Sequence, residues 1–181
     1  MGAGVHVPHC DRQECLSYLV MKTQPTPRSS PASDPARSPV DLEEVDRYRV
    51  ARLATADARG KPLVVPVCFA CGKDAIYSVL DEKPKRVAAS RLRRVRNILA
   101  NPQVRLLVDH YEEDWSRLAY ILVEGIAEMI TEKTERTEHA EALRLLREKY
   151  LQYRVMRLEG RPVIKISPQR LITWKARPRA E

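Results

Sequence analysis

The sequence predicts a mainly β (α+β) fold: a small antiparallel barrel, closed or half-open, with helices packed outside it. Six segments have strand character, three have helical periodicity, and short turns rich in glycine or proline separate neighbouring strands. The 181 residues are enough to bury a core without metal ions or disulfide bonds. We therefore expect one domain over residues 40–175, a disordered N-terminal arm over residues 1–39 and a short tail over residues 176–181.

The expected arm is rich in proline and serine and shows little apolar periodicity. Such a segment buries too little apolar surface to offset the entropy that is lost on ordering. It contains four side chains able to bind metal, namely His6, His9, Cys10 and Cys15. Their spacing matches no zinc module, and we expect no metal site.

The first half of the domain reads as one short helix followed by three antiparallel strands. Apolar side chains recur every three residues over residues 39–49, at Leu42, Val45 and Tyr48. The next segments alternate in polarity or are rich in β-branched valine, as strands are. We place these strands at residues 51–55, 62–69 and 75–80, joined by glycine-containing turns at residues 57–60 and 71–74.

The second half reads as three further strands around a charged helix. A helix ends at Asn101 because proline follows it, and the predicted strands are residues 104–108, residues 118–130 with a bend near Gly125, and residues 162–166 continuing past Pro168 to residue 174. The charged helix is expected over residues 134–153, with a buried stripe of Ala140, Leu143, Leu146 and Tyr150.

The strongest chemical signal is a basic stretch between the third and fourth strands. Over residues 83–96, seven of fourteen side chains are cationic and none is acidic, in a chain of net charge +8. The stretch reads as a helix with an apolar stripe of Leu92, Val95 and Leu99. Three partners for these cations are considered: a phosphate-bearing cofactor, a nucleic acid, or solvent alone.

The position of the cations favours a phosphate. Arg91 and Arg94 lie one helical turn apart and can converge on one anion, with Lys83 and Lys85 approaching from the end of the preceding strand. The stretch contains no aromatic residue on which a base could stack, and this counts against a nucleic-acid-binding module. No Gly-rich phosphate loop is present, so phosphate binding depends on side chains.

Other reactive side chains have competing interpretations. Cys68 and Cys71 lie three residues apart on a strand and point to opposite faces, which favours structural cysteines over a redox or zinc motif. His110 has acidic neighbours and fits either a general acid or base or a structural histidine. For Trp115 and Trp174 two interpretations stay open, stacking on a planar ligand or packing in the core. His139, on the charged helix, is expected to be exposed at the surface.

Several runs together resemble the pyridoxamine 5'-phosphate oxidase-like flavin-binding split barrels, and within them the coenzyme F-420-dependent branch. The most specific are Arg96-Asn-Ile-x-x-Asn-Pro and Asp109-His-Tyr-x-x-Asp-Trp, and the others lie at residues 51–62, 65–69, 76–79 and 125–127. The resemblance covers about residues 40–175. It implies a six-stranded antiparallel split barrel that forms a homodimer, with the cofactor in a groove between two barrels.

The resemblance also implies roles for individual residues. The cofactor ring is expected to contact Pro66, Val67, Cys68, Tyr77, Ser78 and Val79, with Trp115 as a stacking partner. The cofactor phosphate is expected to contact Lys83, Lys85, Arg91, Arg94 and Asn97. Family members often have a lysine at the position that matches Arg94. A proton for the substrate is expected from His110, Tyr111 or water.

The expected activity is hydride transfer from coenzyme F-420, a deazaflavin, to a small organic substrate. The polyglutamate tail of this cofactor would occupy the additional arginines. The alternatives are an FMN-binding oxidoreductase of the same fold, a non-catalytic haem- or flavin-binding protein and a basic nucleic-acid-binding module. No apolar run approaches the roughly 18 residues that span a bilayer, and no secretory cleavage signal is visible. We expect a cytoplasmic protein.

Overall fold

The computed structural model describes residues 42–81 and 91–176. The expected N-terminal arm, together with Lys83 and Lys85 of the basic stretch, lies outside the described residues. None of the described helices is long and apolar enough to cross a membrane.

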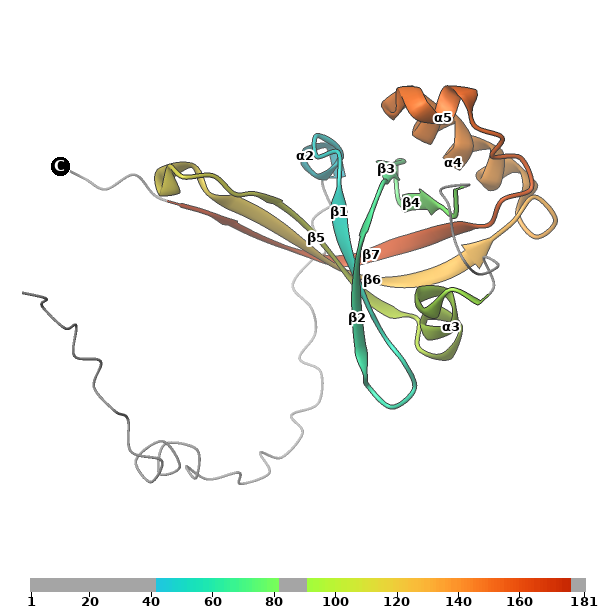
Figure 1. Cartoon of the computed structure of the whole chain (residues 1–181), viewed down its shortest axis with the longest axis horizontal. Coiled ribbons are helices and arrows are strands. Elements are labelled where there is room, and N and C mark those ends of the chain that lie inside the picture. Colours follow the sequence, from blue (N-terminus) through green and yellow to red (C-terminus); the bar gives the residue numbers. More distant parts are fainter. Residues whose placement is uncertain (1–41, 82–90, 177–181) are drawn as a thin grey trace, which may run out of the picture. The chain divides into compact units, whose positions relative to one another are not determined.

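The described residues form a seven-stranded antiparallel sheet with the spatial order β2-β1-β5-β6-β7-β4-β3 (Figure 1). Every pair of neighbouring strands is antiparallel, which confirms the predicted mainly β, half-open barrel with flanking helices. The strands are β1 (Ala51–Ala56), β2 (Pro62–Val67), β3 (Ala70–Cys71), β4 (Ile76–Val79), β5 (Gln103–His110), β6 (Ala119–Ile130) and β7 (Val163–Lys175). The strand beyond the predicted six is the two-residue β3.

Within the described residues, the helices differ in extent from those predicted. They are α2 (Leu42–Asp46), α3 (Arg93–Ala100), α4 (Arg136–Lys149) and α5 (Leu151–Val155), with a 3-10 turn η2 (Trp115–Arg117). The single helix predicted over residues 134–153 is two helices, because Tyr150 adopts an extended backbone conformation between them.

The turn and bend predictions are confirmed. In the β1–β2 turn, the Asp57 carboxylate accepts hydrogen bonds from the backbone of Arg59 (3.0 Å) and Lys61 (2.9 Å), and Gly60 adopts a positive φ of 79°. The register of β6 against β7 shifts between Glu124 and Gly125. A Cβ atom at Gly125 would lie 2.9 Å from the backbone oxygen of Ser167, so only glycine fits this close crossing.

Two apolar clusters hold the sheet and helices together. The first fills the curled sheet and includes Leu53, Leu106 and Ile121. The second lies between the β3–β4–β7 side of the sheet and the α4–α5 pair, and includes Tyr77, Leu146 and Tyr153. Among the predicted cofactor residues, Val67 belongs to the first cluster, and Tyr77 and Val79 belong to the second.

Two predictions about helix faces were wrong. Leu99 is 72% exposed, and its neighbour Ile98 is buried instead, because α3 turns Asn97 toward β1, where its side-chain amide donates to the Thr55 hydroxyl (3.0 Å). On α4, Ala140 is exposed and His139 is buried. The His139 Nε2 atom lies 2.7 Å from the carbonyl oxygen of Arg161, so the protein supplies the polar partner that burial requires.

Candidate functional site

The two segments expected to contact a cofactor ring lie side by side. The Ser78 hydroxyl on β4 donates to the carbonyl oxygen of Cys68 at the end of β2, over 2.8 Å. β3 begins two residues after Cys68 and pairs with β4 through Ala70 and Tyr77. The fold thus brings Pro66–Cys68 and Tyr77–Val79 together from separate strands.

The side chains of these segments differ in what they offer a ligand. Pro66 is exposed, whereas Tyr77, Ser78 and Val79 are buried. The Tyr77 hydroxyl donates to Glu138 on α4 (2.8 Å), and burial, followed by this hydrogen bond, raises the pKa of Tyr77. The Tyr77 hydroxyl is therefore already bonded to α4. Of the paired segments, the part that a ligand can reach is on β2, where Pro66 is exposed.

Arg94 on α3 is the described residue best suited to bind an anion. Its Nε atom is buried and, within the described residues, has no hydrogen-bond partner. Burial lowers the pKa of the Arg94 guanidinium, and the nearby Asp81 carboxylate opposes that shift. A guanidinium stays protonated in proteins, so Arg94 keeps a positive charge with an unused donor. An unpaired buried donor is costly unless a ligand completes it.

Asp81 is a candidate site residue that the sequence interpretation missed. It lies at the end of β4, is 8% exposed and accepts a hydrogen bond from the Tyr153 hydroxyl (2.9 Å). The sequence Asp81-Glu-Lys-Pro has the composition of a turn, and turn aspartates are normally solvated. The burial of Asp81 depends on Arg94 and Tyr153, which come later in the sequence and reach Asp81 only in the folded chain.

The other expected phosphate contacts lie in different environments. Arg91 is exposed at the start of the segment that leads into α3. Asn97 is 2% exposed and its amide is bonded to Thr55, so its side chain joins α3 to β1. Of the predicted phosphate contacts, Arg91 and Arg94 are therefore the cationic side chains that the structure describes.

The expected proton donors lie at the other end of the sheet, in a segment we call the outer ribbon, residues 108–121 and 173–175. His110 pairs with Ala119, which in turn pairs with Lys175. Ser78 pairs with Ile164, eleven residues before Lys175, which corresponds to roughly 35 Å of strand. From the β2 side the path is shorter: Pro66 pairs with Arg52, which pairs with Leu107, and the Arg52 guanidinium forms an ion pair with Asp109, the neighbour of His110.

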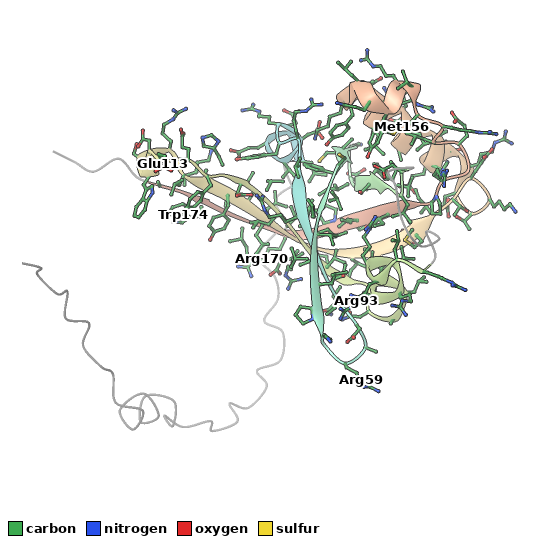
Figure 2. All side chains as sticks on the ribbon, viewed as in Figure 1. Arg59, Arg93, Glu113, Met156, Arg170 and Trp174 are labelled. Atoms are coloured by element: carbon green, nitrogen blue, oxygen red, sulfur yellow. The ribbon has the colours of Figure 1, made fainter. Side chains whose placement is uncertain are left out.

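The side chains of the outer ribbon are largely solvent-exposed. Tyr111 is 76% exposed and Trp115 is 70% exposed. His110 bonds through Nε2 to Glu112 Oε1 (2.7 Å), and Trp174 stacks on Tyr120 with ring centroids 5.6 Å apart. Figure 2 shows Trp174 and Glu113 at this end of the sheet, away from Met156 beside α5.

The chain matches the family model described as pyridoxamine 5'-phosphate oxidase over residues 42–175. The chain belongs to the pyridoxamine 5'-phosphate oxidase family. A search of curated proteins finds no match.

Several solved structures share this fold. The haem storage protein HutZ from Vibrio cholerae has 19% identity and a TM-score of 0.56, over 75% of this chain and 94% of that one. A FAD-binding protein from Mesorhizobium loti has 21% identity and a TM-score of 0.53, over 71% and 87%. An F-420 reductase has 20% identity and a TM-score of 0.50, over 72% and 94%. At these identities the likeness shows the fold alone.

The described cysteines of this oxidase-family chain are in the reduced thiol form. Cys68 and Cys71 are both partly buried and make no disulfide. Burial, followed by the negative charge of Asp46, raises the pKa of the Cys71 thiol, which leaves it protonated and weakly nucleophilic. Residues 42–81 and 91–176 contain no group of three or more His, Cys, Asp or Glu side chains arranged to hold a metal ion.

Proposed function

We propose that this chain is a coenzyme F-420-dependent oxidoreductase that transfers a hydride to a small organic substrate and works as a homodimer. The observation that carries the proposal is the buried Nε atom of Arg94, which has no hydrogen-bond partner among the described residues and belongs to a guanidinium near Asp81, just beyond β4. An F-420 reductase and a FAD-binding protein of the same fold support the choice of a flavin-type cofactor.

The described residues fit a phosphate-bearing cofactor. Arg94 has an unused donor for a phosphate oxygen, and the exposed Arg91 lies on the approach to the same helix. A guanidinium binds phosphate through charge-assisted hydrogen bonds, which are about twice as strong as neutral ones. The exposed Pro66 lies beside the buried β4, so the β2 end offers a surface for the edge of a planar ring.

Each residue then has a defined task. Arg94 binds the cofactor phosphate, and Asp81, fixed by Tyr153, holds the guanidinium in place. When bound, reduced F-420 supplies the hydride. His110, oriented by Glu112, holds a proton at Nε2 that the reduced substrate can accept.

We propose the homodimer from the exposed surface of the outer ribbon. Within one chain, the end of β5 next to His110 lies two strands from the end of β2, and Tyr111 and Trp115 would face a second copy. The exposed aromatic side chains of the outer ribbon are suited to such a contact, because aromatic residues are enriched in protein interfaces.

The experiment is a fluorescence titration of the purified protein with F-420 and, in parallel, with FMN. We expect F-420 to bind more tightly. Preference for FMN would keep the site and change the chemistry, whereas binding of neither, with a Soret band on adding haem, would favour a haem-binding protein. Retardation of nucleic acid that weakens steeply with salt would favour the nucleic-acid alternative.

The first prediction concerns Arg94. Arg94→Ala should weaken F-420 binding by about 1–3 kcal/mol, because it removes a charged hydrogen-bond donor. The matched control is Arg96→Ala, which removes an exposed arginine from the same helix and should change affinity little. Equal effects of the two substitutions would show that Arg94 acts only through general charge.

A further inference from the structure

A pocket of about 310 Å³ opens where the α4–α5 junction meets the ends of β1 and β2. This volume lies at the lower end of the range of small-molecule sites, roughly 300–1,000 Å³. The pocket is mainly apolar and is lined by Arg49, Val50, Cys68, Tyr150, Tyr153 and Met156.

The two tyrosines present their rings to the pocket because the protein already binds their hydroxyl groups. The Tyr150 hydroxyl points its hydrogen toward the carbonyl oxygens of Arg49 (2.7 Å) and Phe69 (2.8 Å) and accepts from the Phe69 amide (3.0 Å). The Tyr153 hydroxyl donates to Asp81. The rings pack edge to face, 5.3 Å apart. Fixed aromatic walls of this kind favour a flat apolar guest.

The remaining apolar lining can adapt to such a guest. Met156 is unbranched and carries a polarisable sulfur that packs favourably against aromatic rings. Val50 is 49% exposed at the pocket, so the pocket is open to solvent on this side. A ligand can therefore enter without unfolding α5.

Arg49 gives the pocket a positive charge. One of its guanidinium nitrogens donates to the carbonyl oxygen of Lys149 (2.8 Å), and the guanidinium lies 4.9 Å from the centroid of the Tyr150 ring. No carboxylate among the described residues forms an ion pair with Arg49. Since a guanidinium has five N–H donors, Arg49 retains donors for an anion from solution.

We propose that this pocket binds a planar, apolar carboxylic acid, with its rings between Tyr150, Tyr153 and Met156 and its carboxylate on Arg49. The acid would be the substrate or part of it, because Cys68 belongs both to the pocket and to the β2 segment expected at the cofactor ring. Only this role as substrate rests on the proposed function.

The test uses 2-naphthoate as the probe and its neutral isostere 2-naphthamide as the comparison, with the full chain and no cofactor. Methionine methyl groups labelled with ¹³C report the position of binding by NMR. Met156 lines the pocket, whereas Met129 packs against the barrel core. We expect 2-naphthoate to shift the Met156 signal, assigned with Met156→Leu, and to leave the Met129 signal in place.

Two substitutions test the charge. Arg49→Gln should weaken 2-naphthoate binding by roughly tenfold, the equivalent of one charge-assisted hydrogen bond, and leave 2-naphthamide binding unchanged. Arg154→Gln removes an exposed arginine from α5 that does not line the pocket and should alter neither affinity. Equal affinities for acid and amide, or equal effects of the two substitutions, would overturn the proposal.

A third substitution tests the location. Met156→Trp should fill the pocket and abolish binding of both probes, while the far-UV circular dichroism and thermal unfolding remain those of a folded protein. Unchanged binding to this folded variant would place the acid elsewhere and overturn the proposal. Arg94→Ala should retain 2-naphthoate binding, so failure of the F-420 titration and failure of the pocket experiment are separate results.

Discussion

The β2–β4 end of the sheet and the outer ribbon use the same kinds of residue in opposite ways. At the β2–β4 end, tyrosine hydroxyls and an aspartate are buried and bonded to groups distant in the sequence, as in Tyr153 with Asp81. On the outer ribbon, His110 bonds to Glu112, two residues away, and Trp115 is exposed. At the β2–β4 end, these buried polar groups find their partners within a single chain. On the outer ribbon, exposed side chains such as Trp115 are available for contact with another molecule.

The comparison teaches where mutation should affect folding and where it should affect assembly. At the β2–β4 end, removal of a side chain leaves a cavity or an unpaired buried group. On the outer ribbon, removal of an exposed side chain such as Trp115 or Tyr111 leaves neither a cavity nor an unpaired buried group. The next four predictions use this difference.

The largest effect is expected from Leu146→Ala on α4. Leu146 is fully buried in the cluster between the sheet and the α4–α5 pair, so the cavity should lower the free energy of unfolding by about 2–5 kcal/mol. Urea unfolding measures this change. Val155→Ala on the neighbouring α5, where Val155 is 88% exposed, is the control. A loss for Leu146→Ala no larger than for the control would contradict the packing described.

A smaller loss is expected from Tyr150→Phe. The ring remains, but the Phe69 amide and the carbonyl oxygens of Arg49 and Phe69 lose their shared partner. The free energy of unfolding should fall by about 1–3 kcal/mol. The control is Tyr111→Phe on the exposed outer ribbon, which should be neutral. Equal stability of the two variants in urea would mean that the Tyr150 hydroxyl contributes nothing.

The pH dependence of stability tests Glu138. Burial alone would raise its pKa, but hydrogen bonds from Lys165 and Tyr77 hold the pKa below the usual 4.5. A lowered folded-state pKa stabilises the protein above the unfolded value, and this stability is lost as the pH falls through the folded value. Below about pH 4.5, wild type should therefore lose more stability than Glu138→Gln, by up to about 1 kcal/mol. Parallel acid limbs in urea unfolding would exclude this contribution.

The smallest effect on folding is expected from Trp115→Ala. Because Trp115 is 70% exposed, the free energy of unfolding of the monomer should change by less than about 0.5 kcal/mol. If the outer ribbon completes the site of a second copy, the same substitution should weaken self-association in analytical ultracentrifugation. Unaltered association, measured beside Arg59→Ala in the β1–β2 turn, would remove Trp115 from the interface.

The fold could be predicted from local patterns because each strand and turn carries its own signal. The aspartate and glycine of the β1–β2 turn, and Gly125 opposite Pro168, specify their geometry within a few residues. The faces of α3 and α4 could not be predicted as well. A shift by one residue exchanges Ile98 with Leu99, and this choice depends on the contact of Asn97 with Thr55, 42 residues away.

The candidate site was harder to predict because it depends on pairing between strands. The adjacency of Cys68 and Ser78 follows from the short link between β2 and β3, since β3 pairs with β4 at the opposite edge of the sheet. The resemblance to known sequences named both segments as expected ring contacts. The position of His110 relative to the β2 end depends on the registers of β1 with β2 and with β5. Asp81 was missed because its burial is created by Tyr153, which lies 72 residues later.

The pairing of β7 has a consequence for how the protein avoids aggregation. β7 pairs with β6 along its length but with β4 only from Val163 to Ile166, so beyond Ile166 its outer edge has no strand partner among the described residues. Open edges can recruit strands from other molecules. Pro168 has no N–H to donate, and Arg170 (Figure 2) and Lys175 add charge along the same edge. These residues would discourage indiscriminate strand addition there while leaving the aromatic side chains available to a specific partner.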